Sequence, residues 1–184
     1  MVTPTTTKET IPLWLAVSIT IVVALPLSLY LGRYNIPLWA SFIVWAEYFT
    51  FGAKASALRI IIPCYAYGAV LTALSLYMTV LLAPHLPKNM ALYISLAVWM
   101  GILVYLLRYS KFLWDGSLAV FNGVSLSLGV YFTASYPATH SIYAQPWVSF
   151  LWVLVAGYIG AFLGWFNVTI TFPRIVRDKS AAAE

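Results

Sequence analysis

Charged residues are scarce in this sequence: they make up 8% of the 184 residues, whereas 62% are hydrophobic. Soluble domains carry roughly 25% charged residues, so this scarcity excludes a protein with an ordinary water-facing surface. A net charge of +5 could indicate nucleic-acid binding, but the cations lie scattered at the ends of apolar runs instead of in one patch. We therefore expect a membrane protein whose partner is the lipid bilayer and not a nucleic acid.

Cysteine and histidine are also nearly missing. The single cysteine, Cys64, excludes an intrachain disulfide and a cysteine-based metal motif. His85 and His140 lie in or near loops between apolar runs, so no pair of histidines is available inside the membrane for haem or copper. No Gly-rich nucleotide loop, Ser/His/Asp arrangement or H-E-x-x-H motif is found in the sequence. We expect no metal site, no cofactor and no enzymatic activity.

What the sequence has in abundance is apolar segments close to the roughly 20 residues that cross a bilayer as a helix. There are six of them, and the loops between them are short: 11–31, 37–53, 58–83, 91–107, 112–135 and 147–172. The segments are apolar throughout and do not alternate, which excludes a β-barrel pattern. We predict an all-α polytopic membrane protein with six transmembrane helices in residues 11–173, flanked by tails at 1–10 and 174–184.

The positions of the cations predict how this bundle is oriented. With six spans, both termini share one side with the second-to-third and fourth-to-fifth loops. That side has eight cations and the other has two, Arg33 and Lys88; the eight are Lys8, Lys54, Arg59, Arg108, Lys111, Arg174, Arg177 and Lys179. Because cytoplasmic loops are enriched in Lys and Arg, we expect both termini in the cytoplasm.

The most unusual stretch is LWASFIVWAEYFTFGAKASALR, residues 38–59, which has one carboxylate in an apolar run. Glu47 lies ten residues after Pro37, about 15 Å along a helix and so near the expected bilayer midplane. Thr50 and Lys54 follow it at helical spacing. Such a carboxyl group either locks the bundle, neutral or paired with a neighbouring helix, or accepts a proton, a cation or a hydrogen bond from a solute.

A second polar stripe lies in the fifth segment, where Asp115, Asn122 and Ser125 share one helical face. Asp115 is close to Lys111 and Arg108, which favours a surface ion pair over a gate. Asn122 is deeper and needs a hydrogen-bond partner, either a neighbouring helix or a solute. It is the best candidate partner for Glu47.

The two polar segments are also candidates for an internal repeat. Six spans divide into three plus three, and an odd number of spans per half makes the halves run in opposite senses. Aligning LWASFIVWAE with LWDGSLAVFN places Glu47 over Asn122, with two identical residues in ten. A 3+3 inverted repeat is therefore a hypothesis, with chance similarity between apolar segments as its competitor.

Small residues recur every four positions in the last segment, at Ala156, Gly160 and Gly164. Such faces let helices approach closely. The seam lies either inside one chain or between copies of it, and the small number of internal partners makes a homo-oligomer plausible.

The segment WASFIVWAEYFTFGAKASALR, the LAPHL sequence at 82–86 and the glycine-rich last helix resemble small bacterial inner-membrane proteins of domain-of-unknown-function family 1097. The resemblance implies a compact multi-span bundle in a prokaryotic cytoplasmic membrane. It implies no activity and no site residue. The family has consecutive glycines around positions 53–56, whereas FGAKAS keeps one glycine, which weakens the case for a tight turn there.

Two functions follow as hypotheses. The first is a small homo-oligomeric channel or carrier for a small polar or ionic solute. Its path would be formed by Glu47, Asn122, Thr50 and Ser125, and its cytoplasmic mouth by Lys54, Arg59 and Asp115. The second is an accessory or structural subunit of a larger membrane complex, with no transport activity of its own.

Overall fold

The computed structural model describes residues 5–7, 9–172 and 175–177. These residues form an all-α bundle, as predicted, together with one pair of three-residue strands. The elements are β1 (Thr5–Thr7), α1 (Leu13–Leu31), α2 (Leu38–Thr50), α3 (Leu58–Leu82), α4 (Met90–Leu107), α5 (Lys111–Asp115), α6 (Ser117–Phe132), α7 (Gln145–Thr171) and β2 (Ile175–Arg177), with 3-10 turns at Gly32–Tyr34 and Ala55–Ala57.

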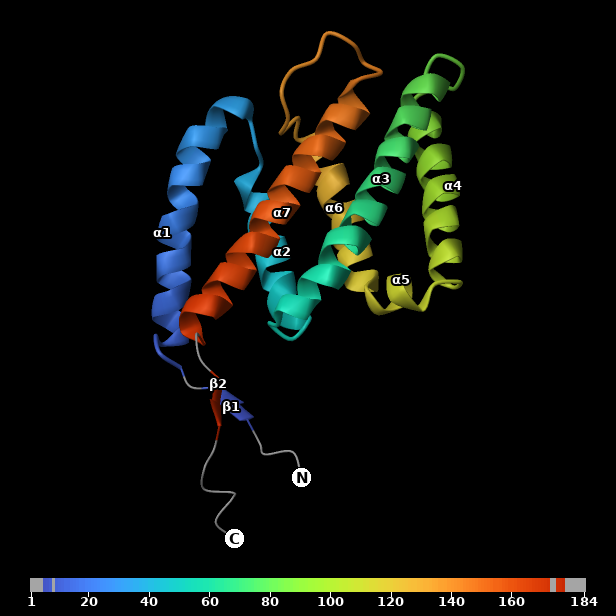
Figure 1. The fold of residues 1–184 in the computed structure, drawn as a ribbon. Helices are drawn as coiled ribbons and strands as arrows, with labels where there is room; N and C mark the ends of the chain where they lie inside the picture. Colours follow the sequence, from blue (N-terminus) through green and yellow to red (C-terminus); the bar gives the residue numbers. More distant parts are fainter. Residues whose placement is uncertain (1–4, 8, 173–174, 178–184) are drawn as a thin grey trace.

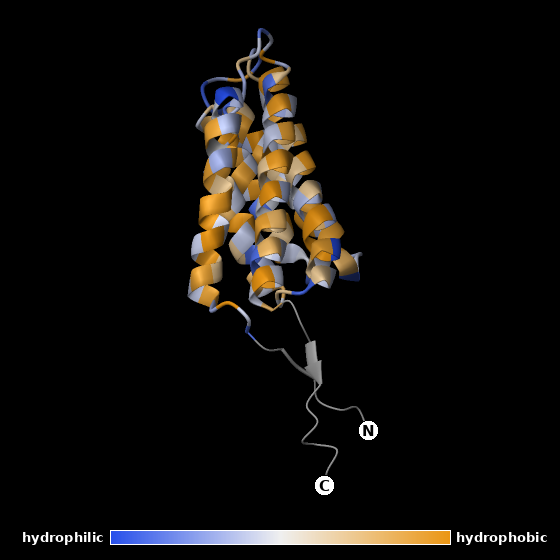
Figure 2. Cartoon of the chain, turned by 60° about the vertical axis from the view of Figure 1, so that its left-hand side comes forward, coloured by the Kyte–Doolittle hydropathy of each residue, from blue (hydrophilic) through white to orange (hydrophobic). Residues whose placement is uncertain are grey.

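Three of the helices are long and apolar enough to cross a membrane: Ala55–Leu82, Met90–Leu107 and Gln145–Thr171. The apolar parts of α1 and α6 are shorter, and α2 has 13 residues, about 20 Å of helix. Large hydrophobic side chains are exposed along the outside of the bundle, for example Leu29 at 82% and Tyr105 at 58%. Figure 2 shows hydrophobic residues along the length of the helices and hydrophilic ones gathered mainly near the two ends. This surface indicates a membrane protein.

One predicted boundary was wrong. The sequence predicts a single helix over 112–135, but the structure has two helices, α5 and α6, separated by a break at Gly116. The break lies directly against α3, because a Cβ atom added to Gly116 would lie 2.4 Å from Sγ of Cys64. Asp115 therefore belongs to α5 and does not share a helical face with Asn122 and Ser125 of α6.

The helices pack in a regular arrangement around α3 and α7, which contact each other at the centre (Figure 1). α3 also packs against α4 and α6, whereas α7 also packs against α1 and α2. In Figure 1, α1 and α4 lie at the two sides of the bundle, and α2 and α6 lie behind the central pair.

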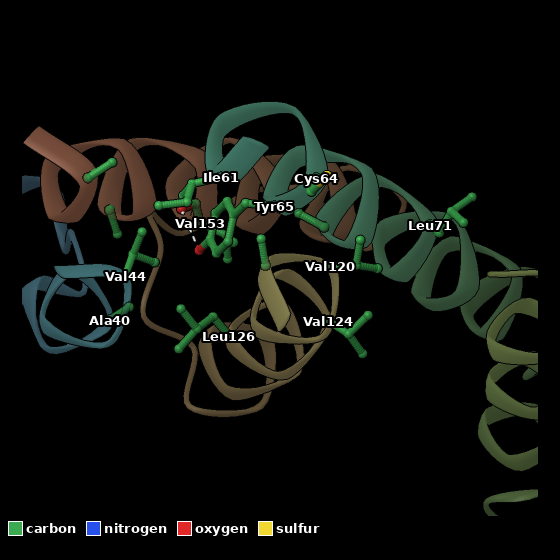
Figure 3. Close-up of a cluster of buried hydrophobic side chains, with 14 of the residues drawn as sticks. Ala40, Val44, Ile61, Cys64, Tyr65, Leu71, Val120, Val124, Leu126 and Val153 are labelled. Carbon is green, nitrogen blue, oxygen red and sulfur yellow. Dashed lines mark hydrogen bonds between the residues drawn. The ribbon is translucent and has the colours of Figure 1, made fainter. Parts of the chain in front are cut away.

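Tyr65 of α3 lies at the centre of the hydrophobic core and is fully buried. Its hydroxyl group donates a hydrogen bond to the carbonyl oxygen of Val153 in α7, at 3.1 Å (Figure 3). Buried apolar side chains of α2, α4, α6 and α7 belong to the same core, including Val44 of α2 and Val120 of α6. The core thus joins the central helices to both α2 and α6.

The two ends of the bundle differ. Both ends of the chain leave the bundle together, because β1 pairs antiparallel with β2 and the amide of Thr10 donates to the carbonyl of Thr171 at 3.0 Å. We call this the termini end; the loops 51–57 and 108–116 also lie there, with Lys54, Arg59, Arg108 and Lys111 (Figure 1). The opposite end has the loops 32–37, 83–89 and 133–144, with Arg33 and Lys88. Lys8, Arg174 and Lys179 lie outside the described residues.

Candidate functional site: a buried carboxyl–amide pair

Glu47 lies on the face of α2 that packs into the bundle, and its residue is only 2% exposed. The helix buries Ala40, Ser41, Val44, Trp45, Glu47 and Tyr48, a spacing of three and four residues that places Glu47 at one edge of the packed face, near its C-terminal end. α2 ends three residues after Glu47, at Thr50. The carboxyl group is therefore about one helical turn from the termini end, and not at the midpoint of the bundle as its distance from Pro37 suggests.

The end of α2 is a Schellman turn, in which two amides bond back into the last helical turn. The amide of Ala53 donates to the carbonyl of Tyr48 at 3.1 Å, and that of Gly52 to Phe49 at 3.0 Å. Gly52 has φ of +87° and Ala53 has φ of +54°. The tight turn is thus present although the chain has one glycine here, because Gly52 occupies the position where a left-handed residue is needed.

Asn122 of α6 is the hydrogen-bond partner of Glu47. Its Nδ2 donates to Oε2 of Glu47 at 2.7 Å, so the two side chains are in direct contact across the helices. The other carboxyl oxygen, Oε1, is buried and accepts no hydrogen bond from the residues that the structure describes. A buried polar atom without a partner costs about 1–3 kcal/mol, so Oε1 is a ready acceptor for a proton or a donor group.

The other residues predicted to form the path do not join this pair. Thr50 and Ser125 are both exposed, and the hydroxyl of Thr50 donates to the carbonyl of Ala46 in its own helix at 3.4 Å. Thr50 lies beyond Tyr48, the last buried residue of α2, and outside the face that α2 packs into the bundle.

The residues predicted for the mouth lie at the termini end but not around the carboxyl group. Lys54 and Arg59 are exposed and lie in or after the turn that follows α2. Asp115 forms an exposed ion pair with Lys111, with Nζ 2.7 Å from Oδ2. The expected surface ion pair of Asp115 is confirmed, and no ionic contact links it to Glu47.

The small residues of α7 form a seam inside the chain. A Cβ atom on Gly160 would lie 2.1 Å from the carbonyl oxygen of Ser41, and one on Gly164 would lie 2.6 Å from Cβ of Tyr48. Ala156 is fully buried as well. This face is used to bring α7 close to α2, so it does not provide a surface for a second copy.

A second buried polar contact was missed in the sequence. Asn167 of α7 is fully buried, and its Nδ2 donates to Oγ1 of Thr20 in α1 at 3.1 Å. The signal was present, because Thr20 lies midway between Ala16 and Ala24 at spacings of four, a small-residue stripe typical of a packed helix face.

Glu47 is buried in this structure, whereas Asn122 is half-buried. Two cavities of the described chain, of about 610 Å³ and about 250 Å³, are lined by other residues. A solute can therefore reach the carboxyl group of Glu47 only if the helices around it move.

Comparison with known proteins agrees with the resemblance seen in the sequence. The model of the family described as "Protein of unknown function (DUF1097)" matches residues 15–171, and the chain belongs to this family. No curated protein and no solved structure matches it. Function must therefore be argued from the site itself.

Proposed function

We propose that this protein is a membrane carrier for a small polar or ionic solute, and that Glu47 and Asn122 are the groups that meet the solute. The observation that carries this proposal is the buried carboxyl group with one oxygen bonded to Asn122 and the other without a partner. Ionisable groups at such positions are costly inside a membrane and are rare outside ion, proton or substrate paths.

In this proposal six helices span the membrane, α1, α2, α3, α4, α6 and α7, while α5 lies at the termini end. The cation-rich termini end faces the cytoplasm of a prokaryotic cell. The tails at 1–10 and 174–184 then lie in the cytoplasm, on either side of the transmembrane domain at 11–173.

The packing supports a 3+3 inverted repeat. If α1, α2 and α3 correspond to α4, α6 and α7, then the contacts of α3 with α6 and α4 match those of α7 with α2 and α1. Corresponding helices run in opposite directions in Figure 1: α1 and α3 start at the termini end, whereas α4 and α7 start at the opposite end. Transporters built this way work by moving one repeat against the other.

Two glycine contacts give the register of the repeat. Gly68 of α3 would place a Cβ atom 2.0 Å from the carbonyl oxygen of Val120, and Gly160 of α7 would place one 2.1 Å from that of Ser41. Val120 is the fourth residue of α6, and Ser41 is the fourth residue of α2. This register differs by four residues, one helical turn, from the one that aligns Glu47 with Asn122.

The closed site favours a carrier over a channel, because an open channel needs a continuous path and Glu47 is sealed. The path lies within one chain. A homo-oligomer is compatible with this proposal but would need a surface other than the small-residue seam, which packs internally. The alternative, an accessory subunit of a larger complex, would also need a free helix face. The small-residue seam does not provide one, because it packs inside the chain.

Flux through reconstituted liposomes tests the proposal. Purified protein is inserted into proteoliposomes, and uptake of protons and of a panel of small ions and neutral polar solutes is compared between the wild type and Glu47→Gln. Glutamine keeps the size of the side chain and a hydrogen bond to Asn122 but cannot exchange a proton. We expect at least one flux to fall roughly ten-fold or more, as when one charge-assisted contact is lost.

The matched control is Asp115→Asn, which neutralises an exposed carboxyl group already paired with Lys111. Its flux should equal that of the wild type. Circular dichroism and size-exclusion chromatography establish that both variants are folded. A Glu47→Gln protein with every wild-type flux intact would remove the proposed role.

A further inference from the structure

The larger of the two cavities lies at the opposite end of the bundle from the carboxyl–amide pair. It measures about 610 Å³ and lies between the turn after α1, the segment after α6 and the start of α7. Arg33, Tyr34 and Asn35 line it from the turn after α1, Tyr136 lines it from the segment after α6, and Gln145 lines it from the start of α7. This volume is in the range of small-molecule sites, about 300–1,000 Å³.

The walls of this cavity are held together by hydrogen bonds between distant parts of the chain. Nδ2 of Asn35 donates to the carbonyl oxygens of Ala134 at 2.8 Å and Tyr136 at 3.1 Å. Nε1 of Trp152 in α7 donates to the carbonyl oxygen of Tyr34 at 2.7 Å. The cavity is therefore preformed, and a ligand would not have to order loops in order to bind.

Its charge is positive and uncompensated. The guanidinium group of Arg33 lies 4.6 Å from the centroid of the Tyr34 ring, which holds it at the cavity. No carboxylate pairs with Arg33 among the described residues. The loops at this end, 32–37, 83–89 and 133–144, contain no Asp or Glu at all.

We propose that this cavity binds a small oxyanion, a carboxylate or a phosphate, on the guanidinium group of Arg33. The planar fork of an arginine matches two oxygens of such an anion, and it does so best where no protein carboxylate competes. Tyr34, Tyr136 and Gln145, whose side chains carry neutral hydrogen-bond donors, line the same space. The site is separate from Glu47 and does not depend on the proposed transport.

Direct binding to the full-length protein in a neutral detergent tests this site. Isothermal titration uses two probes, inorganic phosphate and benzoate, at fixed ionic strength. We expect saturable binding of at least one probe, weakened roughly ten- to hundred-fold in Arg33→Gln and partly restored in Arg33→Lys, because a charge-assisted contact contributes about 1.5–3 kcal/mol. Lys88→Gln is the matched control: it removes the other cation of this end, which does not line the cavity, and should leave the affinity unchanged.

A second measurement identifies the source of the oxyanion. The protein is placed in nanodiscs of phosphatidylcholine, with or without phosphatidic acid. If phosphatidic acid abolishes probe binding by the wild type, a lipid headgroup occupies the site; if it has no effect, the ligand is a free anion. Either result supports the proposal.

Two results would overturn it. One is the lack of saturable binding of both probes to the folded wild type, both in detergent and in nanodiscs without phosphatidic acid. The other is an Arg33→Gln protein, folded by circular dichroism, that binds the probes as tightly as the wild type.

Discussion

The first three helices and the last four can be compared position by position. α3 packs against α4 and α6, and α7 packs against α1 and α2, with a glycine at each of the two closest approaches. In the register set by those glycines, Glu47 of α2 corresponds to Leu126 of α6, and Asn122 corresponds to Ile43. The Glu47–Asn122 contact of α2 with α6 is polar, whereas the two corresponding positions are apolar: Leu126 is buried and Ile43 is 41% exposed.

This difference bears on what the carboxyl–amide pair is for. Leu126 is buried in the core at 3% exposure, so the position of α6 that corresponds to Glu47 packs with an apolar side chain. In the proposed function, the polar pair of this half, with one oxygen unbonded, meets a solute or a proton.

The largest effect is expected when a side chain is added at either of the two close approaches between helices. Gly68→Ala and Gly160→Ala each place a methyl group about 2 Å from a backbone carbonyl oxygen, which cannot move without separating two helices. Each should lower the free energy of unfolding by about 3 kcal/mol. Titration with a denaturing detergent from mixed micelles measures this change.

The control for this pair is Gly101→Ala on α4, where an added Cβ meets no atom within 4 Å. It should be neutral or stabilise the helix by up to about 1 kcal/mol. If one of the two glycine variants is destabilised and the other is not, the two halves do not pack equivalently.

A smaller effect is expected from breaking the polar pair. Asn122→Leu leaves the buried carboxyl group of Glu47 without its donor and should cost about 1–3 kcal/mol of unfolding free energy. The double variant Glu47→Leu/Asn122→Ile gives these two positions the residues found at the corresponding positions of the other half. Removing both partners should restore most of the stability, while any flux that depends on Glu47 stays lost.

The same detergent titration measures both variants beside the proteoliposome flux. A double variant that is less stable than Asn122→Leu would show that the pair is a structural lock after all, and that the halves differ in packing as well as in polarity.

The smallest effect concerns the turns that end α2 and α6. Both are Schellman turns, since the amide of Ser135 donates to Val130 at 3.0 Å and that of Ala134 to Tyr131 at 3.1 Å. The left-handed position is occupied by Gly52 in one and by Ala134, with φ of +51°, in the other. Ala134→Gly should therefore raise the free energy of unfolding by about 0.5–1 kcal/mol, and Gly52→Ala should lower it by about 1 kcal/mol. Thermal unfolding measures the stability change of each variant. Changes of opposite sign would agree with the prediction, and changes of the same sign would contradict it.

Much of the fold could be predicted because it depends on local properties. Apolar runs of helical length predict helices in membranes whatever their neighbours are, so most helix ends in the structure lie within a few residues of the predicted ones. The polar residues Glu47 and Asn122 could be picked out for the same reason, since a carboxyl group in an apolar run stands out by itself.

Other features depend on contacts that no local pattern encodes. The break at Gly116 lies directly against Cys64, 52 positions earlier in the chain. The exposure of Thr50 and Ser125 follows from how narrow the buried stripes of α2 and α6 are. The cavity at Arg33 is closed by hydrogen bonds from Asn35 to residues 99 and 101 positions away.

By itself, the sequence determined that this is a helical membrane protein, where its cations concentrate and which two side chains are costly to bury. Those are properties of composition and of single helices. Only the tertiary structure decided that Asn122 bonds to Glu47, that the small residues of α7 pack within the chain and that an uncompensated arginine lines a preformed cavity. Each of these needs segments far apart in the sequence to meet, and that geometry is set by the packing of whole helices.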